Sequence, residues 1–299
     1  MDDINFYCMQ STLTDPGQYA YLFDDLPENI PDLCEVLRNL FMHYADVELH
    51  SFPATPIRYA EMDNRSVTNI LACILKYDSR SLTKRRETHH RVMGVCRDIS
   101  LLLCAVLRHR KIPARLTSGF VNYYIPQFNL DAVNLEYWNE EAGRWCMVDS
   151  RTDPHSKTLT KSPIDFALYD VPKDKFLPAE MAWQHYREGK INGNHFGSRK
   201  YRGAWYVRNR LIHQLAFLNK KEMLIWDLWG DMQVHREGKP CLLEEQLDGL
   251  DKLAELIRNH KNNLMLMKDC YEKNINFKIR NSVSVFNPYL DQRVEYVNA

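Results

Sequence analysis

The sequence lacks the features that mark several classes of protein. Its eight cysteines are scattered and none forms a CxxC pair, which argues against a zinc ribbon or a redox dithiol. No apolar run approaches the length of a membrane span. The formal net charge of the 299 residues is +0, so no overall positive field would attract nucleic acid or an anionic membrane. We therefore expect neither nucleic acid nor membrane among its partners.

Other absences concern the compartment and the organisation of the chain. The first residues, MDDIN, are acidic and show no secretory pattern. Scattered thiols without such a pattern are typical of a reducing compartment, so we predict a cytoplasmic protein with free cysteines. The sequence contains no internal repeat and no low-complexity segment. Its length allows one large domain or a core with an appendage.

The strongest local pattern runs over residues 94–120. Cys96 stands just before apolar residues at three- and four-residue spacing, which predicts the buried face of a helix. Pro113 ends this helix, and residues 115–120 predict a short strand. A thiol in the first turn of a helix can have its pKa lowered and become a nucleophile. By its spacing alone Cys96 would more simply be a small buried hydrophobe, as we expect for Cys104.

The order of four short segments changes that interpretation. GVCRD, IPAR, SGF and RWCMVD follow one another in a pattern that resembles the core of the transglutaminase-like superfamily. The resemblance spans roughly residues 90–153 and implies an α+β, papain-like fold, in which the cysteine helix packs on an antiparallel sheet. It also implies a Cys-His-Asp triad, with Cys96 as nucleophile and Asp149 orienting the histidine. Taken alone, Asp149 would be an ordinary carboxylate at the end of a strand.

One element departs from the superfamily pattern. The segment DAVNLEYW begins at Asp131 and places Ala132 where the histidine belongs. Three explanations are open: an engineered substitution, a natural pseudoenzyme that binds without turnover, or another histidine acting as the base. The candidates for that other base are His89, His90 and His155, each of which fits a solvated loop. We favour the engineered change at this point, because Cys96 and Asp149 are both retained.

The alternation of this segment makes a further prediction about position 132. Ala132 shares a strand face with Asn134 and Glu136, opposite to Val133 and Leu135. We therefore expect a side chain at position 132 to point into a cleft and not into the core.

The remaining pattern predicts two parts. Residues 1–175 would form the transglutaminase-like core with a helical N-terminal layer, and residues 176–299 a mainly helical extension packed on it. The stretch 205–229 also looks like the helical extension of uncharacterised bacterial members of the superfamily. Helices are expected over 31–44, 64–77, 179–187, 205–218 and 244–259, strands over 116–124, 131–138 and 144–149, an exposed connection over 79–90 and a short polar tail from 276.

Three residues of the extension are candidates for binding substrate. Trp205, Arg208 and Trp226 could wall a cleft, together with Asp227, as aromatic anchors with a charged partner. Ordinary core packing of the tryptophans and a surface charge pair explain the same residues equally well.

The function predicted from these patterns is cysteine-dependent acyl transfer. The substrate would be an amide or thioester in a peptide, a protein or a small molecule, and the acyl group would pass to water or to an amine acceptor. This chemistry needs no metal and no organic cofactor. The chain itself is expected to be inactive or impaired at Ala132. The alternative is a natural pseudoenzyme that serves as a binding or scaffold module.

Overall fold

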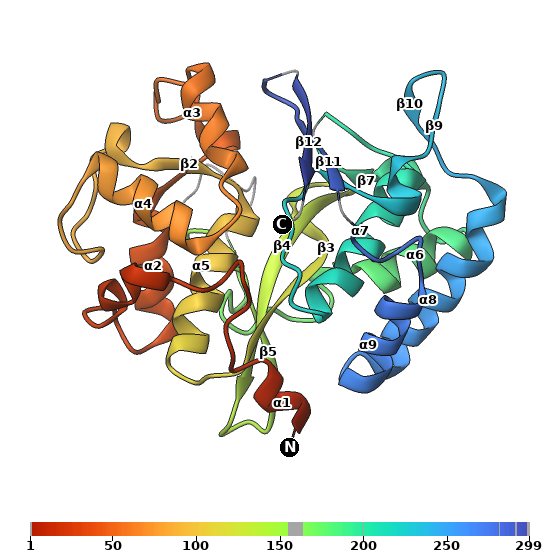
Figure 1. The fold of residues 1–299 in the computed structure, drawn as a ribbon, viewed down its shortest axis with the longest axis horizontal. Coiled ribbons are helices and arrows are strands. Elements are labelled where there is room, and N and C mark those ends of the chain that lie inside the picture. The colour runs from red at the N-terminus through yellow and green to blue at the C-terminus, as the bar shows by residue number, and fades with distance from the viewer. Residues whose placement is uncertain (1, 155–163, 199, 281, 291, 298–299) are drawn as a thin grey trace.

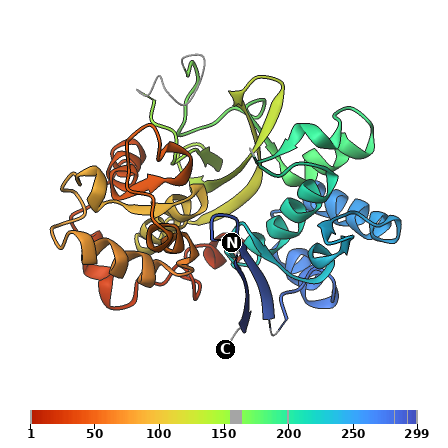
Figure 2. The same ribbon diagram turned by 90° about the horizontal axis from the view of Figure 1, so that it is seen from above.

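The molecule has an antiparallel sheet between two groups of helices. The computed structural model describes residues 2–154, 164–198, 200–280, 282–290 and 292–297. Figure 1 shows the N-terminal helices (red to orange) on one side of the sheet and the C-terminal helices (green to blue) on the other. The view from above in Figure 2 shows the same arrangement. The predicted α+β class, with the cysteine helix packed on an antiparallel sheet, is confirmed.

The N-terminal layer is built from short helices with well-defined caps. At the start of α2 (Ile30–Leu40) the side chain of Asn29 accepts a hydrogen bond from the backbone N–H of Asp32. At the start of α4 (Val67–Tyr77) the side chain of Ser66 accepts one from the backbone N–H of Asn69. The layer also contains the short helices α1 (Asp2–Phe6) and α3 (Pro56–Ala60).

The helix predicted over 31–44 ends at Leu40. The next residues form β1 (Phe41–His43), which pairs in parallel with β2 (Val92–Gly94). This pairing places His43 opposite Gly94, two residues before Cys96. Strand pairing across the layer therefore overrides the helical pattern of the sequence.

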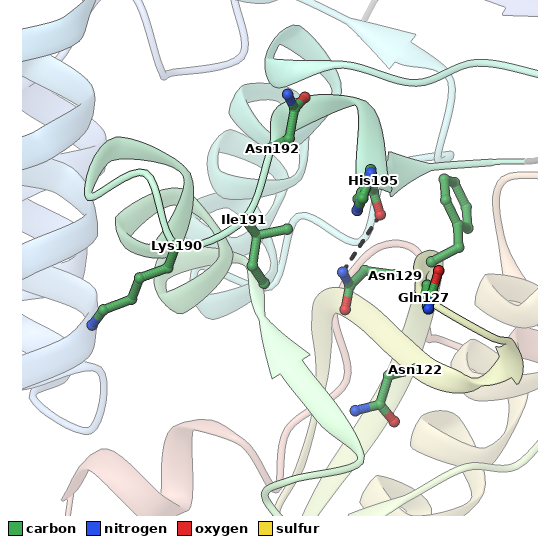
Figure 3. A pocket seen from close by; sticks show the side chains of 8 residues that line it. Asn122, Gln127, Asn129, Lys190, Ile191, Asn192 and His195 are labelled. Atoms are coloured by element: carbon green, nitrogen blue, oxygen red, sulfur yellow. Dashed lines mark hydrogen bonds between the residues drawn. The ribbon is translucent and has the colours of Figure 1, made fainter.

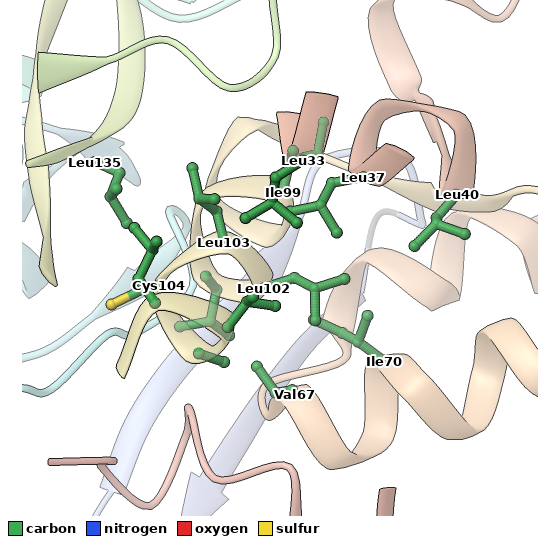
Figure 4. Close-up of a cluster of buried hydrophobic side chains, with 14 of the residues drawn as sticks. Leu33, Leu37, Leu40, Val67, Ile70, Ile99, Leu102, Leu103, Cys104 and Leu135 are labelled. Carbon is green, nitrogen blue, oxygen red and sulfur yellow. The ribbon is translucent and has the colours of Figure 1, made fainter. Parts of the chain in front are cut away.

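Helix α5 (Cys96–His109) lies at the centre of the molecule. It carries twelve buried residues and packs against α2 and α4 on one side and the sheet on the other. Figure 4 shows Ile99 and Leu102 among side chains of α2 and α4, with Cys104 on the side of Leu135 in the sheet. A fully buried leucine contributes about 1.5–3 kcal/mol, so this helix is a main source of stability.

The central sheet positions the candidate site. Its strand order is β5-β4-β3-β6, and β7 (Phe196–Gly197) pairs in parallel with the start of β4. Strand β5 covers residues 135–139 of β4, and β7 covers residues 129–130. Among the described strands none pairs with the intervening residues 131–134 on that edge. The four strands are β3 (Ala114–Ile125), β4 (Phe128–Asn139), β5 (Arg144–Val148) and β6 (Phe176–Pro178).

The C-terminal part combines helices with a small sheet. A second apolar cluster joins its helices to the far side of the central sheet. The tail, expected only to be short and polar, forms the hairpin of β11 (Ser282–Asn287) and β12 (Gln292–Val297), and β11 pairs with β8 (Asp227–Leu228). None of the helices in the described ranges is long and apolar enough to cross a membrane. The helices are α6 (Ala179–Arg187), α7 (Ala204–Leu218), α8 (Leu247–His260) and α9 (Leu264–Lys273), and β9 (His235–Arg236) pairs with β10 (Lys239–Pro240).

Candidate active site

Cys96 is the first residue of α5 and lies against the open edge of β4. Its Sγ accepts the backbone N–H of Val133 at 3.4 Å. The start of the helix is fixed by Asp98, whose Oδ2 accepts the backbone N–H of Val95 at 2.9 Å. The predicted position of the thiol, in the first helical turn and next to a strand, is thus present in the structure.

The electrostatics of the thiol differ from the prediction. Burial, and after it the carboxylate of Asp131, raise the pKa of Cys96 to about 12, although the Val133 amide and Arg151 act in the opposite direction. The lowering of the pKa that a place in the first helical turn can give is not found for Cys96, because burial of the thiol is the largest effect on it. At neutral pH this side chain is a protonated thiol and a weak nucleophile.

Asp149 follows β5 and is buried, with every acceptor position in use. Its Oδ1 accepts the backbone amides of Arg151 and Thr152, each at 3.0 Å. Its Oδ2 accepts the hydroxyl of Thr152 at 2.5 Å and the hydroxyl of Tyr123. An ionised carboxylate offers about four acceptor sites, so an imidazole could reach Asp149 only by displacing one of these donors.

Ala132 does not face a cleft, and the prediction that it does is wrong. It is 6% exposed and belongs to an apolar cluster with Val121, Val171 and Phe176. Tyr123 packs against the same cluster. Gly119 lies opposite Ala132 in β3, and a Cβ atom there would come within 2.6 Å of the Phe176 ring. The glycine thus allows Phe176 to cover this face of the sheet.

The other histidines considered from the sequence lie elsewhere. The rings of His89 and His90 contact each other at a tilt of 57° in the short 3₁₀ turn Thr88–His90, and His89 is exposed. His155 falls outside the described residues. The sequence analysis did not single out His43, whose Nδ1 is 3.2 Å from a guanidinium nitrogen of Arg151. No spacing signal identified it, because its strand was expected to be the end of a helix.

Arg151 links the parts of this region. Its guanidinium pairs with Asp46 at 3.3 Å and lies over the ring of Tyr124 at 5.1 Å. Its backbone amide holds Asp149. Burial and Asp131 together raise the pKa of Cys96 more than this cation lowers it.

The three candidate substrate residues have different surroundings. Arg208 is fully buried and donates to the carbonyls of Cys241 and Met232, so its predicted place in a cleft wall is wrong. Trp226 is partly buried, donates to Asp63 at 3.2 Å and packs in the cluster that contains Val95. Trp205 contacts the rings of Tyr201 and Tyr206 at the start of α7. Asp227, considered with them, is buried in an ion pair with Arg65 at 2.5 Å.

A pocket opens at the turn between β3 and β4 (Figure 3). It contains none of the predicted catalytic or substrate residues. In the part of the chain that the structure describes, no group of three or more His, Cys, Asp or Glu side chains could hold a metal ion. The lining consists mainly of amide side chains with one lysine and one histidine: Asn122, Gln127, Phe128, Asn129, Lys190, Ile191, Asn192 and His195.

One comparison with known proteins finds a family model over the region of the motifs. Residues 65–150 match the family model of the transglutaminase-like superfamily. No curated protein matches the chain. Among solved structures, a "putative cysteine protease" from Cytophaga hutchinsonii is 16% identical, with a TM-score of 0.34. That match covers 54% of this chain and 44% of the other protein, so the chain spans less than half the length of that protein.

Proposed function

Residues 65–150 belong to the transglutaminase-like superfamily, whose members are generally cysteine enzymes, and from this premise we propose that Cys96 marks the nucleophile position of an acyl-transfer site. The substrate class is an amide or a thioester. With a base present, the thiolate would attack the carbonyl carbon and expel the amine or thiol, leaving an acyl group on sulfur. Water or an amine would then accept the acyl group.

In the present chain we propose that the site binds such a carbonyl compound without turning it over. The observation that carries this proposal is the hydrogen bond from the Tyr123 hydroxyl to Asp149, which occupies an acceptor site of the carboxylate that would orient an imidazole. The raised pKa of Cys96 supports it, because a protonated thiol does not attack an amide. Ala132 provides no group that could take the proton.

The packing also bears on the origin of Ala132. Replacing a histidine by alanine in an otherwise active enzyme would leave space beside the aspartate. Here Tyr123 donates to Asp149 and packs with Phe176 against the cluster that holds Ala132. We therefore favour the natural pseudoenzyme over the engineered substitution.

The test uses an aryl thioester and measures three quantities. Intact-mass spectrometry would detect an acyl adduct, released thiol would report turnover, and thermal shift would report binding. We expect a thermal shift without turnover at pH 7, and a Cys96→Ala variant with the same thiol release as the parent chain. An adduct on Cys96 together with turnover above that control would overturn the proposal.

A further inference from the structure

The C-terminal hairpin reaches from its own sheet to the N-terminal layer. Its turn, residues 287–290, is called the hairpin tip below. Asn287 is buried, and its Nδ2 donates to the carbonyl of Tyr59 and to Oδ2 of Asp63, each at 3.1 Å. Figure 1 shows the hairpin (dark blue) between α3 and the C-terminal half. The tip therefore bridges segments more than two hundred residues apart in the chain.

Tyr289 gives the tip its second attachment. Its ring stacks on Tyr59 with a centroid distance of 4.8 Å and an interplanar angle of 5°. It also contacts the ring of Tyr44 at 5.1 Å. Tyr289 remains 40% exposed, so the tip lies on the outside of these two tyrosines.

The tyrosines covered by the tip lie close to the start of α5. Tyr44 and Tyr59 pack against the buried cluster that contains Val95, the residue before Cys96. Tyr44 follows His43, which is paired with Gly94. Burial is the main cause that raises the pKa of Tyr44, and Tyr289 and the thiol of Cys96 raise it further, so the ring under the tip lies near the thiol.

A shared carboxylate connects the tip to a tryptophan of the same cluster. Asp63 accepts the Nε1–H of Trp226 on Oδ1 and the amide of Asn287 on Oδ2. Trp226 was a candidate substrate residue, and it packs against the same cluster as Tyr44, the one that contains Val95. Movement of the tip would therefore break the hydrogen bond between Asn287 and Asp63, and Asp63 is the residue that binds Trp226.

We propose that the hairpin tip is a lid, held closed by Asn287 and Tyr289, that controls access to Cys96. Each contact of Asn287 and Tyr289 with the N-terminal layer is worth about a two- to tenfold change in an equilibrium, so the open form is accessible. A separate hydrogen bond, from Nζ of Lys200 to the carbonyl of Pro288 at 3.3 Å, attaches the tip to the C-terminal part. Lids of this kind exclude water from a site until a ligand replaces their contacts. The proposal concerns access to the thiol and does not depend on whether Cys96 performs chemistry.

The experiment measures alkylation of Cys96 by iodoacetamide at pH 9, followed by peptide mass spectrometry. We expect Tyr289→Ala and Asn287→Ala each to raise the alkylation rate of Cys96 about three- to tenfold. Tyr289→Phe keeps the ring that stacks on Tyr59, so it should raise the rate less than Tyr289→Ala does. Cys104 lies two turns further along α5 and is fully buried, so it serves as an internal reference.

Two outcomes would overturn the lid. One is an unchanged Cys96 rate in both alanine variants. The other is a parallel rise at Cys96 and Cys104, because a general loosening of the fold would then explain the result. Since no acyl substrate is used, failure of the lid and failure of the proposed function would be seen in different measurements.

Discussion

At the scale of single residues, Tyr123 and Ala132 determine whether Asp149 can act as a member of a catalytic triad. Asp149 still follows its strand, but it accepts two backbone amides and two hydroxyls. A carboxylate with these partners organises the loop after β5 and has no free acceptor for an imidazole. The retained aspartate is therefore as well explained by structure as by catalysis.

The first prediction concerns restoration of the histidine. Because Ala132 is packed in a cluster, we expect Ala132→His to destabilise the protein by about 1–3 kcal/mol. This replaces the expectation from the sequence that the change would cost little. The variant alone should not lower the pKa of Cys96, since Tyr123 still holds Asp149. Urea unfolding and the pH profile of Cys96 alkylation measure the two effects.

A double-mutant cycle provides the control. Tyr123→Ala removes both the ring and the hydroxyl, so Ala132→His should cost less in that background than in the parent chain. Strictly additive changes in the free energy of unfolding would mean that the two positions do not compete for the same space.

At the scale of elements, local patterns predicted what depends on local sequence. The apolar spacing of α5 and the alternation of β4 identified both elements, and the predicted range 179–187 is that of α6. β1 and the C-terminal hairpin were missed, because their pairing with β2 and β8 joins distant segments. Residues 79–90 were predicted to be an exposed connection, but Arg86 within them is buried. Its guanidinium donates to backbone carbonyls of its own loop.

In the candidate site, too, the sequence predicted which elements carry the residues but not the contacts between distant segments. Motif order placed Cys96 and Asp149 on the correct elements, α5 and the end of β5. Nothing in the sequence around Tyr123 indicates that its hydroxyl reaches Asp149, because Tyr123 lies on β3 and Asp149 follows β5, on the other side of β4. The raised pKa of Cys96 could not be predicted from the sequence either, because it depends on burial of the thiol and on the position of Asp131.

The second prediction concerns Glu136, which connects β4 to the end of α8. Burial alone would raise the pKa of this carboxyl, but Lys261 and Arg115 outweigh burial and lower it to about 2. Lys261 and Arg115 both lie 2.8 Å from its oxygens. A lowered pKa gives stability that is present above the unfolded pKa of about 4.3 and lost as the pH falls toward 2.

We expect this ionisation to contribute roughly 3 kcal/mol to the free energy of unfolding at pH 7. Urea unfolding between pH 6 and pH 3 should show the decline in the parent chain and a shallower decline in Glu136→Gln. Glu141→Gln, at an exposed position, is the matched control. Equal pH dependence in the parent and in Glu136→Gln would contradict the assignment.

At the scale of the whole molecule, buried polar contacts join the two predicted parts. Arg108 of α5 pairs with Glu222 at 2.8 Å, and both side chains are fully buried. Ser11 donates to the other oxygen of Glu222, and the hydroxyl of Tyr7 donates to the carbonyl of Leu218. Neither part could separate from the other without leaving a buried charge unpaired.

The third prediction follows from this pair. Glu222→Ala leaves the guanidinium of Arg108 buried without its partner, so we expect a loss of about 3–5 kcal/mol. Unfolding should remain a single transition, with far-ultraviolet circular dichroism and tryptophan fluorescence changing together. Separate transitions for the two probes would show that residues 1–175 and 176–299 are independent units.

The hydrogen bonds between distant segments also determine which contacts can form early and which must form late during synthesis of the chain. The carboxylate of Asp3 accepts a hydrogen bond from the backbone N–H of Leu264, and the hydroxyl of Tyr7 donates to the carbonyl of Leu218. The carbonyl of Tyr59 accepts a hydrogen bond from the side-chain amide of Asn287. During synthesis the N-terminal segment leaves the ribosome long before any of these partners exists. The apolar faces of α2 and α4 can be covered as soon as α5 and the central sheet have been made, because those elements share their cluster. The polar contacts of the N-terminal segment with residues 218, 264 and 287 form only when almost the whole chain has been made, so this segment completes its contacts last.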